Sequence, residues 1–378
     1  MKKLVRLGIG LELVLAGIGL LYMAECEKSK PVINLITKTV RQPVKSEKPE
    51  ASCLPENSAL PTATPKGFIK WVDFNVTYEA LNQSYKLDKE SHEEEVQLDW
   101  VALLAYAGTK CGGNFSDSSK IQKYIAEAAE QFKRKQINVE KLSEKLKYYA
   151  YYYEAYSAVL GGIVGEFEIQ TLSEDTSELV WEKRYGIKGF SPIAKNFGYS
   201  EFDDFGVSRS YGYQRRHLGH DMMGLVGTPV IAVESGYIEA LGWNQYGGWR
   251  IGIRSFDGKR YYYYAHLRKD FPYCKTLKEG CIVQAGDVIG YLGRTGYSTK
   301  ENVNNINTSH LHFGLQLIFD ESQKEGNNEI WVNVYPIVRF LAQNRSEAVK
   351  DETTKEWVRV YDIRDPVAEK MKKKNKEG

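Results

Sequence analysis

Apolar and polar positions follow four successive patterns along the 378 residues of this chain. An almost continuous apolar run, interrupted by Glu12, occupies residues 7–24, and a polar stretch follows it to residue 67. Residues 68–168 then show apolar positions at the spacing of amphipathic helices. After residue 181 short apolar runs alternate with Gly, Asn and Asp, which is typical of strands. The pattern predicts an α+β protein with an N-terminal membrane anchor, a disordered spacer, a helical middle region and a C-terminal all-β antiparallel domain.

The N-terminal run predicts a signal anchor, or transmembrane helix, over residues 1–24. Lys2, Lys3 and Arg6 form a basic flank, and such flanks stay on the cytoplasmic side of a membrane. The residues before Glu25 are not the small ones that a cleaved signal needs. We therefore expect a single-pass protein of the cell membrane whose C-terminal part is extracytoplasmic. A form secreted after cleavage is the less favoured alternative.

Residues 25–67 are predicted to form a flexible spacer. Six prolines are spread through this stretch among Ser, Lys, Glu and Thr. A segment of this composition cannot bury enough apolar surface to fold on its own. We expect the spacer to lift the rest of the chain away from the membrane.

The region 68–168 is predicted to be helical. Its clearest helices lie at residues 98–106, which the glycine pair 112–113 ends, and at residues 118–135. Residues 147–160 hold six tyrosines. We interpret them as part of a helix whose rings pack partly in a core with their hydroxyls outward. A sugar-binding groove is the alternative.

Carboxylates in the same region raise one minor hypothesis, a glycosidase. Glu154, Glu166 and Glu168 could each supply a general acid. The sequence shows no second carboxylate in a recognisable partnership with any of them. The hypothesis predicts that the helical half alone would release sugar ends from a glycan.

Residues 182–345 are predicted to form an antiparallel β domain. Asp257 and Gly258 separate two of its strands and are typical of a hairpin turn. The predicted strands occupy residues 230–233, 236–241, 249–254, 260–265, 288–292 and 310–317. The remaining residues, 346–378, are rich in charge and are predicted to be a solvated tail.

The overall composition limits the classes of function. Hydrophobic residues make up 42% of the chain and charged residues 26%, which is ordinary for a globular protein with a sizeable core. The chain has 51 basic and 49 acidic residues, so its formal net charge is only +2. It lacks the basic excess of nucleic-acid-binding proteins, and no nucleic-acid partner is expected.

The cysteines give little information about function. Cys26, Cys53, Cys111, Cys274 and Cys281 do not have the spacing of a zinc finger. The last two lie close enough in sequence to form a disulfide in an exported protein. Two free thiols are the equally favoured alternative.

Two short histidine motifs in the predicted β domain indicate a metal site. His217 and Asp221 are four residues apart, and His310 and His312 are two apart, so in strands each pair shares a face. Glycines within the first motif, and the apolar run after it, argue against a helix there. Two such strands facing each other can hold one ion with two imidazoles and a carboxylate. This leaves a position open for water, as catalytic zinc requires.

These motifs belong to an ordered series that resembles the lysostaphin/LytM-type zinc metallopeptidases, which hydrolyse peptide cross-bridges in bacterial cell walls. The resemblance covers about residues 186–341. It rests on the motifs HLGHD (217–221), GTPVIA (227–232), GYI (236–238), YAHL (264–267), VQAGDVIG (283–290) and HLHF (310–313). The resemblance implies that the β domain has the family's duplicated hybrid motif.

The resemblance also implies one Zn²⁺ ion per chain. Its ligands would be His217, Asp221 and His312. His266 and His310 would lie beside the ion as catalytic groups. This gives the chain every residue that the family's reaction requires.

The expected function is that of a zinc metalloendopeptidase, a peptidoglycan hydrolase acting on stem or cross-bridge peptides, with a zinc-activated water as nucleophile and two histidines assisting. The alternative is a non-catalytic wall-binding or activator module of the same family, which the complete set of site residues disfavours. His220 departs from the family pattern, in which its position is usually apolar. Strand alternation directs its side chain away from the metal, so we do not count it as a ligand.

Overall fold

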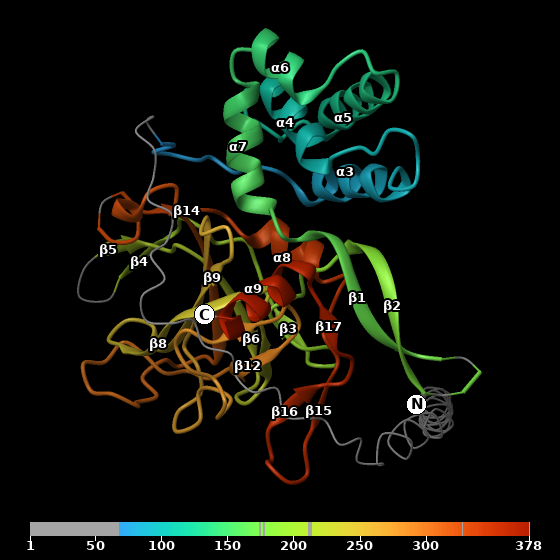
Figure 1. Ribbon diagram of the computed structural model, residues 1–378. Helices are drawn as coiled ribbons and strands as arrows, with labels where there is room; N and C mark the ends of the chain where they lie inside the picture. Colours follow the sequence, from blue (N-terminus) through green and yellow to red (C-terminus); the bar gives the residue numbers. More distant parts are fainter. Residues whose placement is uncertain (1–67, 174, 177, 211–213, 327, 378) are drawn as a thin grey trace, which may run out of the picture. The chain divides into compact units, whose positions relative to one another are not determined.

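Helices come first along the described chain, and strands dominate after residue 163 (Figure 1). The structure is a computed structural model. It describes residues 68–378 except 174, 177, 211–213, 327 and 378. The predicted anchor at 1–24 and the predicted spacer at 25–67 lie outside these residues. Within the described ranges, no helix has the length and apolar character needed to cross a membrane.

The helical part lies between residues 78 and 160, drawn in blue to green in Figure 1. Its helices are α3 (Tyr78–Glu90), α4 (Trp100–Cys111), α5 (Ser118–Lys133), α6 (Val139–Lys145) and α7 (Tyr149–Leu160). Asp99 caps α4 by accepting a hydrogen bond from the amide of Val101 at 2.8 Å. Gly112 ends the same helix with a left-handed backbone at φ 61°, which glycine adopts without strain. The helices predicted at residues 98–106, 118–135 and 147–160 correspond to α4, α5 and α7.

The helices end earlier than the predicted boundary at residue 168. Helix α7 stops at Leu160, and Gly162 follows it with a left-handed backbone at φ 81°. Strand β1 (Val164–Leu172) begins directly afterwards and pairs antiparallel with β2 (Leu179–Ile187). The predicted boundary was wrong because a glycine turn converts the chain from helix to strand before its apolar pattern visibly changes.

The tyrosines of α7 pack in the core, but their hydroxyls are not all directed outward. Tyr156 is fully buried. Tyr151 donates a hydrogen bond to the backbone oxygen of Trp71 at 3.1 Å, and Tyr153 donates one to Asp99 at 2.9 Å. These hydroxyls tie α7 to the rest of the helical part, so internal packing accounts for them.

The three carboxylates considered for a glycosidase lie on α7 and β1. Glu154 and Glu166 are exposed to solvent. Glu168 forms an ion pair with Arg364 at 3.4 Å. This arrangement gives no support to the glycosidase hypothesis.

The β part is built on an eight-stranded antiparallel sheet (Figure 1). Its order is β11-β8-β9-β10-β13-β6-β3, with β14 paired to β13 outside this path. The strands are β3 (Tyr199–Ser200), β6 (His220–Gly224), β8 (Gly236–Asn244), β9 (Gly248–Ser255), β10 (Arg260–Ala265), β11 (Ile282–Val283), β13 (His310–Leu317) and β14 (Ile330–Trp331). The predicted turn at Asp257 and Gly258 joins β9 to β10, with Gly258 at φ 73°. The expectation of an antiparallel β domain is confirmed.

Two smaller pairs of strands, helix α8 and a 3₁₀ turn also belong to this part of the chain. Strand β4 (Ser208–Ser210) pairs with β5 (Gln214–Arg216), and β7 (Pro229–Ile231) pairs with β12 (Val288–Tyr291). Helix α8 (Tyr335–Leu341) follows the large sheet, and a 3₁₀ turn spans Glu321–Gln323.

The two faces of the large sheet differ in character, as β10 illustrates. Tyr262 and Tyr264 are buried, and their rings pack against Phe313 with centroids 6.1 and 5.2 Å away. Tyr263 points to the opposite face, where its ring lies 6.0 Å from that of His312. One face therefore forms the core, and the other carries the candidate site.

The predicted charged tail at 346–378 is wrong as a description of this segment. It contains the pair β15 (Ala348–Lys350) and β16 (Trp357–Arg359), then β17 (Ile363–Arg364), which pairs with β1, and α9 (Pro366–Glu377). Asp365 is buried and forms an ion pair with Lys188 at 3.2 Å. The few apolar positions among the charges, Ile363 and Ala368, are buried and fix the segment to the fold.

A buried arginine joins the helical part to the large sheet. Arg260, the first residue of β10, forms an ion pair with Glu234 at 2.7 Å. It also donates a hydrogen bond to the backbone oxygen of Ala158, near the end of α7, at 2.9 Å. Because both charges are buried, each depends on the other for compensation.

Cys111 and Cys274 are free thiols. No disulfide joins Cys274 to Cys281, so the pairing considered for an exported protein is not formed. Burial raises the pKa of the Cys274 thiol to about 12.

Candidate metal centre

The pairing of β6 with β13 brings the two histidine motifs together. His312 lies directly opposite Asp221 in this antiparallel pair, so the two side chains share a face. His310 lies opposite Met223 on the same face. His217 is not in a strand as expected, because β5 ends at Arg216 and β6 begins at His220. Its side chain nevertheless reaches the same group.

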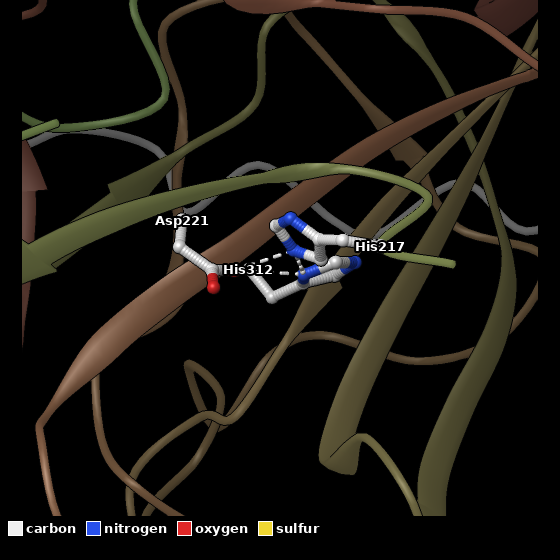
Figure 2. A group of neighbouring side chains, drawn as sticks. All are labelled: His217, Asp221 and His312. Carbon is white, nitrogen blue, oxygen red and sulfur yellow. Dashed lines mark hydrogen bonds and ion pairs between the residues drawn. The ribbon is translucent and has the colours of Figure 1, made fainter. Parts of the chain in front are cut away.

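Three electron-donating atoms converge at this point (Figure 2). Oδ1 of Asp221 lies 3.0 Å from Nε2 of His217 and 2.9 Å from Nδ1 of His312. The two ring nitrogens are 3.0 Å apart. His217, Asp221 and His312 are the group of ligand-type side chains in the described residues whose donor atoms all lie within 4.8 Å of one another. Two imidazoles and a carboxylate in this arrangement fit a divalent ion such as zinc.

The charges and burial of the group favour metal binding. Burial alone would raise the pKa of Asp221, but its contacts with His217 and His312 outweigh burial and hold the pKa well below the ordinary value. Burial lowers the pKa of His312, although Asp221 opposes this effect. At neutral pH the group therefore presents a carboxylate and an uncharged imidazole, the forms that bind metal.

Asp204 lies against the ring nitrogen of His217 that faces away from the candidate metal site. It is 4% exposed, and its Oδ1 lies 3.0 Å from Nδ1 of His217, off the line of an ideal hydrogen bond. A carboxylate at this distance favours a proton on Nδ1 and leaves the lone pair on Nε2. Arg209 contacts Asp204 and lies 3.3 Å from Oδ2 of Asp221. Sequence reasoning missed both residues, because their spacing from the histidine motif matches no simple periodicity.

His266 and His310 lie beside the three donors. Their rings are 4.8 Å apart, and Nε2 of His310 is 3.7 Å from Oδ1 of Asp221. His266 lies just outside the strands of the large sheet. It follows the last residue of β10 with a left-handed backbone at φ 60°. This turn directs its ring toward the ring of His312, 5.8 Å away.

Backbone carbonyls orient both of these histidines. Nδ1 of His266 lies 2.9 Å from the oxygen of Thr295, and Nδ1 of His310 lies 2.8 Å from the oxygen of Thr308. A carbonyl oxygen only accepts, so each Nδ1 donates and each Nε2 keeps its lone pair. Burial lowers the pKa of His266 well below its ordinary value, and the nearby His310 and His312 lower it further.

His220 does not join the group. As the neighbour of Asp221 in β6, its side chain points to the other face. There Nε2 lies 2.7 Å from the carboxylate of Glu201, and the ring lies 5.2 Å from that of Tyr335. The structure places His220 in a separate buried contact.

Gly219 gives His312 the space that it occupies. A β-carbon at residue 219 would lie 2.5 Å from both Cε1 and Nε2 of His312 and 2.9 Å from the backbone oxygen of Phe313. These separations are well below ordinary van der Waals contact, so a side chain here would displace the imidazole. The glycine between His217 and Asp221 thus belongs to the architecture of the site.

Residues 215–325 match the sequence profile of peptidase family M23. The C-terminal half of the chain carries a peptidase M23 domain. The resemblance to the lysostaphin/LytM type, expected from the ordered motifs, is confirmed. All of the candidate ligand and catalytic residues lie within the matched range.

Individual relatives agree with this assignment. The L-Ala–D-Glu endopeptidase of Bacillus subtilis is 35% identical over 148 residues, which cover 39% of this chain and 42% of the relative. Lysostaphin of Staphylococcus staphylolyticus is 42% identical over 98 residues, covering 26% of this chain and 18% of lysostaphin. The chain thus spans less than half the length of each of these relatives.

A solved structure covers more of the chain. It is a Ruminococcus gnavus protein assigned as the glycyl-glycine endopeptidase lytM, and it is 24% identical with a TM-score of 0.46. The similarity covers 77% of this chain and 95% of that protein.

Proposed function

We propose that this M23 domain is a zinc-dependent endopeptidase that hydrolyses peptide bonds in bacterial peptidoglycan. The observation that carries the proposal is the convergence of His217, Asp221 and His312, with His266 and His310 beside them. Peptide-bond hydrolysis is also the activity in the name of the L-Ala–D-Glu endopeptidase of Bacillus subtilis.

His217, Asp221 and His312 would hold the zinc ion. They provide the number and type of ligands that catalytic zinc sites use, with room left for a substrate or water. Zinc supplies two things when bound, a more acidic water molecule and polarisation of the scissile carbonyl. Asp204 orients His217, and the carbonyl-facing Nδ1 atoms orient the two remaining histidines.

His266 and His310 would move protons and stabilise the developing oxyanion. His266 is uncharged at neutral pH because burial lowers its pKa, so its Nε2 can accept a proton. Nε2 of His310 is also an acceptor, and after it takes a proton it can donate to an oxygen that gains negative charge. The two rings are close enough to act on the same reacting group.

The proposed site of action is outside the cytoplasm. It rests on the basic flank and apolar run at residues 1–24, which predict a membrane anchor. Protease added to cells stripped of their wall should then digest the C-terminal part. Protection of that part would refute both the localisation and access to a wall substrate.

Metal analysis of matched variants tests the proposed ligands. His312→Ala should leave the purified full chain with almost no zinc, whereas His220→Ala, on the other face of β6, should keep close to one zinc per chain. Full occupancy in His312→Ala would show that the ligand assignment is wrong. A zinc-loaded wild type that never cleaves purified peptidoglycan would favour the non-catalytic module instead.

A further inference from the structure

Two arginines near the metal centre have no carboxylate partner among the described residues. Arg215 lies on β5, two residues before His217. Arg250 lies on β9, two residues before Gly252, which pairs with Tyr263 of β10. Alternation along β9 therefore places Arg250 on the same face of the sheet as Tyr263 and the metal-binding side chains.

Arg215 contacts Tyr297, an aromatic residue beside the site. One Nη atom contacts the hydroxyl of Tyr297, and the guanidinium carbon lies 5.1 Å from the centre of that ring. The Tyr297 ring in turn lies 5.7 Å from the ring of His266. Nε of Arg215 is buried and has no hydrogen-bond partner among the residues that the structure describes. The Tyr297 ring thus lies between the guanidinium group of Arg215 and the ring of His266, a candidate catalytic residue.

Arg250 lies near Tyr261 of β10, to which its side chain is hydrogen-bonded. Its Nε is buried and has no hydrogen-bond partner within the described part of the chain. Tyr263 shares a face of the sheet with Arg250, and its ring lies 6.0 Å from that of His312. Arg250 is therefore on the face of the sheet that carries the metal centre.

Burying the N–H of a charged group without an acceptor lowers the stability of the protein. A carboxylate is the acceptor that a guanidinium group binds best. Within a peptide chain a D-glutamyl residue keeps one carboxyl group free, whereas a glycine bridge has none.

We propose that Arg215 and Arg250 bind a free carboxylate of the substrate peptide close to the scissile bond, so that this enzyme acts on acidic stem peptides rather than on uncharged glycine bridges. This assignment rests on the proposed endopeptidase function. Tyr297 holds the guanidinium group of Arg215 in place, and Tyr261 holds that of Arg250.

Two synthetic stem peptides test the carboxylate site. One has a free carboxylate on its D-glutamyl residue, and the other has a carboxamide at that position. The zinc-loaded full chain should cleave the acid with the higher kcat/KM. Loss of a charge-assisted hydrogen bond in Arg215→Gln or Arg250→Gln should lower kcat/KM for the acid by about tenfold to a hundredfold. The value for the amide should change little.

Arg216→Gln is the matched control, because Arg216 is the exposed neighbour of Arg215 on the same strand. It should leave the preference for the acid intact. Equal losses on both peptides in Arg215→Gln, or an equal loss in Arg216→Gln, would overturn the carboxylate site.

Binding separates this inference from the proposed function. Calorimetry with the two peptides on the full chain carrying His266→Ala should show tighter binding of the acid, and adding Arg215→Gln should abolish the difference. No cleavage by the wild type together with this binding preference would refute the endopeptidase function alone. Cleavage of peptidoglycan together with equal binding of acid and amide would refute the carboxylate site alone.

Discussion

Removing the carboxylate of Asp204 should weaken zinc binding without removing any ligand. Asp204 is 4% exposed, and its Oδ1 lies 3.0 Å from Nδ1 of His217. Its negative charge favours the tautomer in which Nε2 of His217 has its lone pair. That nitrogen is the one that lies 3.0 Å from Oδ1 of Asp221, within the metal centre. The variants Asp204→Asn and Asp204→Ala remove the charge and the whole acceptor respectively.

The expected loss of zinc affinity differs between Asp204→Asn and Asp204→Ala. Loss of a residue that orients a metal-binding histidine typically lowers metal affinity by about tenfold to a hundredfold. Asp204→Asn keeps an oxygen acceptor beside Nδ1, so we expect the lower end, about 1.4 kcal/mol of binding free energy. Asp204→Ala also leaves Arg209 without its nearer partner, and we expect the upper end, about 2.8 kcal/mol.

Competition with a chromophoric zinc chelator measures these affinities, and thermal unfolding of the metal-free proteins shows whether each variant folds. Asp203→Asn is the matched control, since the carboxylate of Asp203 accepts a hydrogen bond from Asn333 at 3.0 Å, away from the metal. It should bind zinc as the wild type does. Wild-type affinity in Asp204→Ala, or an equal loss in Asp203→Asn, would refute this role of Asp204.

Four further substitutions test other parts of the structure. Gly219→Ala should lower zinc affinity by displacing His312, as measured with the same chelator; unchanged affinity would show that the ring has room to move. His266→Ala and His310→Ala should keep their zinc but lose about a hundredfold to ten-thousandfold in cleavage rate, since they remove acid–base groups and no ligand. Zinc loss in either variant, or full activity, would break this division of roles. Arg260→Ala leaves a buried carboxylate without its partner and should cost about 3–5 kcal/mol in urea unfolding. A decrease in the free energy of unfolding below about 1 kcal/mol, the order of magnitude of an exposed ion pair, would contradict this role of the buried pair.

Much of the β domain could be predicted because successive residues along its strands alternate between the core and the opposite face. In β10, Tyr262 and Tyr264 face the core while Tyr261 and Tyr263 face the site side. The turn at Asp257 has the glycine that such hairpins require. The same alternation correctly places His312 beside Asp221, because both lie within paired strands.

The remaining features depend on contacts between distant parts of the chain. His217 lies outside the strand that was expected to hold it, and the left-handed turn at His266 leaves no mark in the spacing of apolar residues. Asp204 becomes part of the site only because its loop folds against His217. At the C-terminus, abundant charge concealed the buried Ile363 and Ala368, which decide the structure of that segment.

The central claim is that zinc bound by His217, Asp221 and His312 makes this chain a peptidoglycan endopeptidase. It is tested most directly by measuring the release of new amino groups from purified peptidoglycan by the metal-stripped full chain, before and after one equivalent of zinc. We predict no release from the stripped protein, recovery with one equivalent, and no recovery in His312→Ala at the same zinc concentration. Equal release by stripped and zinc-loaded protein, or recovery in His312→Ala, would contradict the account.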